Sequence, residues 1–157
     1  MWHVSIGQVH FIIKSGGLIP LLLMVPNFLW MALPPTSTPE GEADEPLWLG
    51  IIENIGRIAV LLLPFFYVLD FDRRFSRLAA IAMAGSLIVY YAGWVRYFFG
   101  GRSYAWLKAP LLGVPIPLAV FPVIFLLLSS CLMNSWAMLA AAVFFGVTHL
   151  WVSSMGL

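Results

Sequence analysis

The sequence predicts an all-α fold, a polytopic bundle of about five transmembrane helices forming one integral membrane domain over residues 1–157. Two observations carry this prediction. The chain is 62% hydrophobic and only 10% charged, whereas about a quarter of the residues of a soluble domain are charged. Several apolar runs also approach the roughly 20 residues that cross a bilayer at 1.5 Å per residue. The expected spans are about 11–33, 47–69, 78–99, 116–133 and 136–152.

Composition also excludes several classes of function. The net charge of +1 and the lack of a clustered basic face argue against nucleic-acid binding. A single cysteine, Cys131, cannot form an intrachain disulfide. The N-terminal residues show neither the basic start of a cleavable signal peptide nor a lipidation signal. We expect no cofactor. We also expect no metal site, because the carboxylates of the acidic loop at 34–46 lack the spacing of a calcium-binding loop.

The first span, about 11–33, contains prolines that should kink it. Pro20 and Pro26 each remove a backbone donor, and Asn27 follows the second proline directly. Asn27 could either bond the carbonyls freed by the kink or contact a ligand, and the sequence leaves both open. The loop at 34–46 then holds four prolines and four carboxylates, so we expect it to be extended and solvated.

The second span, about 47–69, carries Glu53, Asn54 and Arg57 inside an apolar run. A charged side chain in the middle of a membrane helix costs about 2.5–3.5 kcal/mol on insertion scales, so a mere anchor would not keep these residues. Glu53 and Arg57 are spaced i,i+4 in the order that favours an ion pair on one helix face. Pro64 should bend the end of this span.

The third span, about 78–99, follows an arginine-rich turn at 70–77 that favours a cytoplasmic turn and N-terminus. Its second half places Tyr90, Trp94 and Tyr97 on one face, with Tyr91 beside them and Arg96 within the cluster. Aromatic residues near a helix end usually form an interfacial belt. Tyr90 and Tyr91 lie deep for such a belt, which favours the wall of a pocket.

An interfacial segment and a short turn flank the fourth span. Residues 100–117, before that span, contain glycines, prolines and Lys108, and we expect this segment to lie on the lipid headgroups. Asn134 and Ser135 should turn the chain and cap the fifth span, which is rich in alanine and suited to close helix packing. His149 lies near the far end of that span.

Counting depths along antiparallel spans places the polar residues in one half of the membrane, on the side of the acidic loop. A five-helix bundle could therefore gather them in a single cavity. The predicted catalytic residues are Glu53, Asn54, Arg57 and His149, and the predicted substrate-binding residues are Asn27, Tyr90, Tyr91, Trp94 and Arg96.

Such a cavity suggests an enzyme for a lipophilic, isoprenoid-like substrate, either an acid-initiated cyclase or an isomerase. A carboxyl group in apolar surroundings, Glu53, could hold a proton and donate it. Asn54, Arg57 and His149 would tune or relay protons, although Arg57 would also favour the charged carboxylate. Aromatic rings could stabilise a cationic intermediate over their faces.

The same residues allow a second, non-enzymatic interpretation. The Glu53, Asn54 and Arg57 cluster could be an interhelical polar clamp or an ion-coupling site in a small carrier or accessory subunit. In either case we expect a multi-pass protein of the cell membrane whose partners are membrane lipids and a lipophilic small molecule. Nucleic acid is not expected, and a homo-oligomer remains an option.

Four stretches carry a resemblance to known proteins: Pro26-Asn27 with Leu33–Pro35, Glu53–Ile58, Tyr90–Phe98 and Gly113–Ala119. In these the chain resembles a group of small bacterial multi-span membrane proteins with no assigned activity. In size and span number it is similar to small bacterial membrane terpene cyclases. That resemblance implies a membrane-embedded acid that protonates an alkene or epoxide, but no motif of the cyclases matches here, so a role for Glu53 rests on its chemistry.

Overall fold

A computed structural model describes residues 15–36 and 46–155, and over these residues the protein is all-helical. Its elements are α2 (Leu18–Ala32), α3 (Leu47–Leu62), the 3₁₀ turn η1 (Leu63–Phe66), α4 (Arg74–Phe99), α5 (Ala105–Lys108), α6 (Pro117–Met133) and α7 (Trp136–Ser154). The only β-type pairings in this part are two isolated bridges. The predicted all-α bundle is therefore confirmed. The start of the first predicted span and most of the acidic loop lie outside the described residues.

Three of the described helical stretches are long and apolar enough to cross a membrane. They are Leu47–Phe66, Arg74–Phe99 and Trp136–Ser154. The other two apolar helices, α2 and α6, are shorter, with 15 and 17 residues. Each predicted span thus corresponds to an apolar helix, and three of the five reach full length by themselves.

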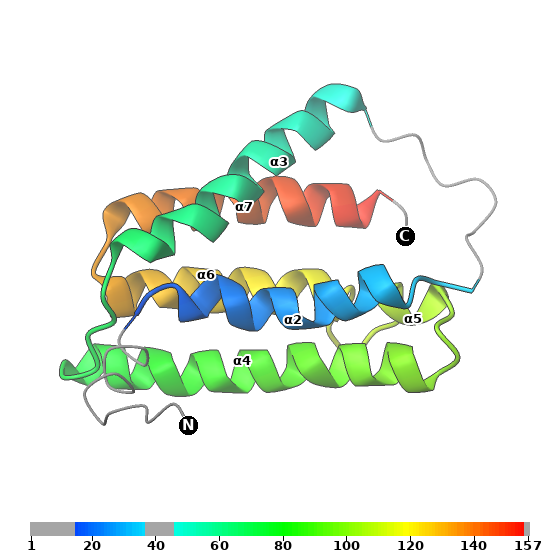
Figure 1. The fold of residues 1–157 in the computed structure, drawn as a ribbon, viewed down its shortest axis with the longest axis horizontal. Coiled ribbons are helices and arrows are strands. Elements are labelled where there is room, and N and C mark those ends of the chain that lie inside the picture. Colours follow the sequence, from blue (N-terminus) through cyan, green and yellow to red (C-terminus); the bar gives the residue numbers. More distant parts are fainter. Residues whose placement is uncertain (1–14, 37–45, 156–157) are drawn as a thin grey trace, which may run out of the picture.

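The long helices run roughly side by side in the bundle (Figure 1). In packing, α6 lies between α4 and α7, and α3 packs on the other side of α7. The N-terminal end of α3 inclines away from α7, and α2 runs along α4 and α6 (Figure 1). Contacts of α2 with its neighbours are sparse compared with those of the other long helices. The polar contacts that Tyr90 and Tyr91 of α4 make with α2 are therefore important in holding it.

Small residues allow the close approach of α7 to its neighbours. A Cβ atom at Gly146 would lie 2.7 Å from Val123 Cγ1 on α6, and one at Gly56 on α3 would lie 3.0 Å from Phe145 Cα. Ala142 on α7 is fully buried. Close backbone approach through small side chains is how membrane helices gain packing energy when hydrophobic exclusion is absent.

Two of the predicted features are present at the helix ends. Pro64 lies where α3 tightens into η1, and Ser135 Oγ accepts a hydrogen bond from the Met138 amide at 3.1 Å, which confirms the predicted cap. Helix α4 begins at Arg74, four residues before the predicted start of the third span at residue 78. Hydropathy excludes arginines from a span, but their long side chains can reach the interface from within a helix.

Candidate functional site

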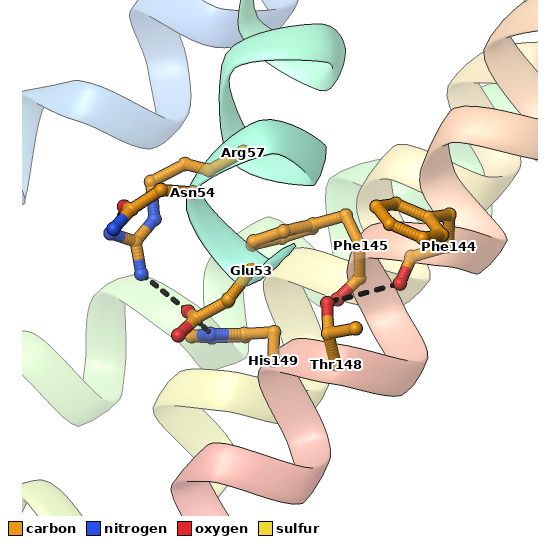
Figure 2. A network of polar contacts seen from close by, with 7 residues as sticks. All are labelled: Glu53, Asn54, Arg57, Phe144, Phe145, Thr148 and His149. Carbon is orange, nitrogen blue, oxygen red and sulfur yellow. Dashed lines mark hydrogen bonds and ion pairs between the residues drawn. The ribbon is translucent and has the colours of Figure 1, made fainter. Parts of the chain in front are cut away.

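Glu53 is the centre of a polar cluster between α3 and α7. Only 5% of its surface is exposed. Its Oε1 accepts a hydrogen bond from Arg57 Nη2 and lies 2.8 Å from His149 Nδ1 on α7 (Figure 2). Arg57 also donates from Nη1 to Asn54 Oδ1 at 2.8 Å. The structure therefore brings together the four residues predicted as catalytic, and it forms the predicted i,i+4 ion pair.

The local sequence explains how the cluster is positioned. Gly56 lies one turn after Glu53, and its missing side chain lets α3 approach Phe145. The ring of Phe145 stacks on the His149 imidazole with 4.8 Å between centroids and 15° between planes, which fixes the imidazole (Figure 2). Thr148 turns its hydroxyl back to the carbonyls of its own helix, so it does not compete for Glu53 (Figure 2).

Charge compensation keeps this cluster tolerable in an apolar bundle. A buried carboxylate loses several kcal/mol of hydration, which only close charge and hydrogen-bond partners offset. Glu53 has both kinds of partner, while 43% of the Arg57 side chain and 21% of the His149 side chain stay exposed. The carboxylate is thus enclosed, and its two partners are the groups that a ligand can reach.

A partly open cavity of about 690 Å³ lies beside the cluster. That volume falls in the usual range for small-molecule sites. Its wall is mostly apolar and includes residues from all the described helices. The polar and aromatic residues on it include Asn27, Trp30, Arg57, Tyr90, Trp94, Tyr104, Lys108, His149 and Ser153. Glu53 does not line the cavity but supports Arg57 and His149, which do.

Asn27 bonds a carbonyl of its own helix and also lines the cavity, and its contact with a ligand stays a prediction. Its Nδ2 donates to Leu23 O at 2.7 Å, within the turn that contains Pro26, and to Tyr90 Oη at 2.9 Å. Tyr90 in turn donates to Leu23 O at 3.2 Å. Both side chains also line the cavity. Hydrogen bonds from Asn27 and Tyr90 to Leu23 O therefore join this turn of α2 to α4 at the cavity wall.

Trp94 lines the same cavity and carries an unused donor. Only 7% of its surface is exposed, and its indole N–H has no hydrogen-bond acceptor among the described residues. The ring stacks on Phe98, with centroids 5.7 Å apart, and meets Tyr90 edge-on. Packing against the rings of Phe98 and Tyr90 thus holds the Trp94 ring in place.

Two of the predicted substrate-binding residues are not brought to the cavity. Tyr91 Oη donates to Leu22 O at 2.8 Å, and Arg96 donates to Pro110 O at 2.9 Å and to Ala109 O at 2.5 Å. One residue rotates a helix by about 100°, so Tyr91 and Arg96 leave the face that Tyr90 and Trp94 share. Both residues instead fasten neighbouring segments to α4.

Several cavity residues carry no signal in the sequence. Tyr104, Leu107 and Lys108, in and around α5, line one end of the cavity, and Trp30 and Met31 line it from α2. The sequence predicts Lys108 only as part of a segment on the lipid headgroups. The hydrophobic periodicity of the sequence gives no indication of how residues 100–117 fold. Their fold depends on the hydrogen bonds that Arg96 of α4 donates to the carbonyls of Ala109 and Pro110.

Within residues 15–36 and 46–155, no three His, Cys, Asp or Glu side chains come together as a group that could hold a metal ion. Comparisons of the chain with protein-family models, with curated proteins and with solved structures gave no match.

Proposed function

We propose that this chain is a multi-pass protein of the cell membrane that binds a lipophilic, isoprenoid-like molecule in the cavity and isomerises it by proton transfer at His149. The observation that carries the proposal is the His149–Glu53 pair. His149 lines the cavity, while its Nδ1 is bonded to the enclosed carboxylate at 2.8 Å. A carboxylate on one imidazole nitrogen fixes the tautomer and makes the other nitrogen a better base.

The step that fits this pair is a shift of a double bond. Nε2 of His149 takes a proton from the carbon next to a double bond that is conjugated with a carbonyl group, and the double bond moves. The imidazolium exchanges this proton with water at the open side of the cavity, and a proton then returns from it to the carbon beside the carbonyl. Proton and electron count balance without an oxidant. Glu53 stabilises the imidazolium between the two transfers, and Arg57 partly offsets the carboxylate charge.

An acid-initiated cyclisation suits the site less well. Protonating an isolated alkene needs a strong, neutral acid, whereas Glu53 shares one oxygen between a guanidinium and an imidazole and does not line the cavity. Of the two reaction types expected from the sequence, isomerisation is therefore the one we propose.

Deuterium incorporation from solvent tests the proposal and does not require the substrate to be identified first. The purified protein in nanodiscs would be incubated in D₂O with a total lipid extract of the source cells, and the lipids analysed by mass spectrometry. We expect one lipid species to gain deuterium with the wild type and not with His149→Gln. Thr148→Val, the adjacent residue whose hydroxyl bonds its own helix, is the control and keeps the exchange. No enrichment with the wild type would refute the reaction.

The structural clamp is the second candidate, and one observation favours it. Glu53 is enclosed and joins α3 to α7 through His149, which is what a clamp requires. For a clamp alone, Glu53→Gln and His149→Gln lower the free energy of unfolding, and the wild type exchanges no deuterium into any lipid. The same experiment thus separates the two candidates.

A further inference from the structure

Two cationic side chains line the cavity. Arg57 reaches it from α3 and Lys108 from α5, and no Asp or Glu is among the described residues that line it. The carboxylate closest to Arg57, that of Glu53, is enclosed behind it with 5% of its surface exposed. A ligand entering this cavity therefore meets cations on an otherwise apolar and aromatic wall.

Arg57 has hydrogen-bonding capacity left for such a ligand. A guanidinium carries five N–H donors in a planar fork that matches carboxylate and phosphate oxygens. The structure uses one donor on Glu53 and one on Asn54, and 43% of the Arg57 side chain remains exposed. Charge-assisted hydrogen bonds to an anion are about twice as strong as those between neutral groups.

Trp94 supplies an independent indication of a polar ligand atom. The Trp94 side chain lines the cavity, and its indole N–H is buried without an acceptor at hydrogen-bond distance among the described residues. Leaving a buried donor unpaired costs about 1–3 kcal/mol. An oxygen atom of a ligand would remove that cost, whereas a purely hydrocarbon ligand would not.

We infer that the ligand of this cavity is an amphipathic anion, a lipophilic chain with a carboxylate or phosphate headgroup held by Arg57 and Lys108. The inference rests on the proposed function and narrows its substrate class. The apolar wall formed by α2 and α6 takes the chain of the ligand, and its headgroup meets the cations, Arg57 on α3 and Lys108 at the α5 end of the cavity. Lys108 also contacts the Tyr104 ring, 5.0 Å from its Nζ to the centroid, which holds the cation at this end of the cavity.

Matched amphiphiles with one chain length test the inference. Dodecyl phosphate, dodecanoate, dodecanol and dodecyltrimethylammonium would be titrated calorimetrically into the protein in phosphatidylcholine nanodiscs, with empty nanodiscs as the blank and inorganic phosphate as a fifth probe. We expect the two anions to bind at least tenfold more tightly than dodecanol and the cation. Arg57→Gln and Lys108→Gln should each reduce that preference at least threefold. Arg77→Gln removes the same charge outside the cavity lining and should leave the preference unchanged.

The outcomes separate the inference from the function on which it rests. Equal affinities for all four amphiphiles, or tightest binding of the cation, would refute the inference of an anionic headgroup. The proposed binding of a lipophilic molecule in the cavity would still stand. If inorganic phosphate binds as tightly as dodecyl phosphate, the inference that the ligand has a lipophilic chain is refuted, and the site binds free anions. No binding above the blank overturns both the inference and the proposed function. If Arg57→Gln does not fold, the loss of preference in Lys108→Gln alone decides.

Discussion

The hydroxyl of Tyr91 on α4 donates a hydrogen bond of 2.8 Å to the carbonyl of Leu22 on α2. That carbonyl is the one that Pro26 deprives of its helical partner, because a proline has no N–H to donate four residues back. Leu22 lies on the exposed surface of the bundle, where no other described side chain donates to its carbonyl. Tyr91 thus satisfies the proline defect from another helix, and in doing so it holds the loosely packed α2 against α4.

The first prediction is a coupling between Tyr91 and Pro26. Tyr91→Phe should lower the free energy of unfolding by about 1 kcal/mol, the usual net value of one hydrogen bond. In a Pro26→Ala background the restored backbone N–H can bond the Leu22 carbonyl, so the same change should cost clearly less. Unfolding in sodium dodecyl sulfate would give the four free energies of this cycle. An equal cost in both backgrounds would mean that Tyr91 is not compensating for the proline.

The second prediction concerns the order of stability in the Glu53 cluster. Arg57→Gln leaves an enclosed carboxylate with only His149 as a partner, and it should cost about 2–3 kcal/mol. Glu53→Gln leaves a guanidinium that is 43% exposed and can turn to solvent or headgroups, so it should cost about 1 kcal/mol. The measurement is the free energy of unfolding of both variants in the same detergent. The assignment of Glu53 as the enclosed partner fails if Glu53→Gln is the more destabilising change.

The positions of the helices and the ion pair could be predicted because both depend on local sequence. Apolar runs give the helices, and i,i+4 spacing gives the Glu53–Arg57 pair. The contact of His149 with Glu53 could be predicted only by counting residue depths along the spans, and such a count has an error of about one helical turn. The same counting could not separate Tyr90, on the cavity, from Tyr91, about 100° around the helix.

The environment of Arg96 could not be predicted, because its partners belong to an irregular segment. Its acceptors, the carbonyls of Ala109 and Pro110, are positioned by left-handed residues such as Arg102 and Leu112 and by the helical turn of α5. No hydrophobic period describes such a segment. The contribution of Lys108 to the cavity was missed for the same reason.

The third prediction tests the close contact of α3 with α7. A Cβ at Gly56 would lie 3.0 Å from Phe145 Cα, so Gly56→Ala must push the two helices apart at a cost of about 1–3 kcal/mol. The shift should also weaken the Glu53–His149 contact one turn away. Gly85→Ala is the control, because nothing lies within 4 Å of its added Cβ and the helix gains propensity. Similar unfolding free energies for the two variants would contradict the close packing.

The fourth prediction is that Arg96 fixes the end of the cavity formed by α5. Its guanidinium donates hydrogen bonds to the carbonyls of Ala109 and Pro110 and lies 5.1 Å from the Trp106 ring centroid. A lysine ammonium cannot both donate two such bonds in one plane and stack on the ring. Arg96→Lys keeps the charge but should free this segment. Hydrogen exchange of the backbone amides at 105–109 should then be about tenfold faster, which corresponds to about 1.4 kcal/mol of local stability.

Arg77→Lys, the same exchange of side chains near the opposite end of α4, is the control for this measurement and should leave the exchange at 105–109 unchanged. Because Leu107 and Lys108 line the cavity, the freed segment should also loosen the binding of dodecyl phosphate. Unchanged exchange at 105–109 in Arg96→Lys would show that charge alone holds the segment. Faster exchange throughout α4 would instead show that Arg96 stabilises the bundle as a whole and not this end of the cavity.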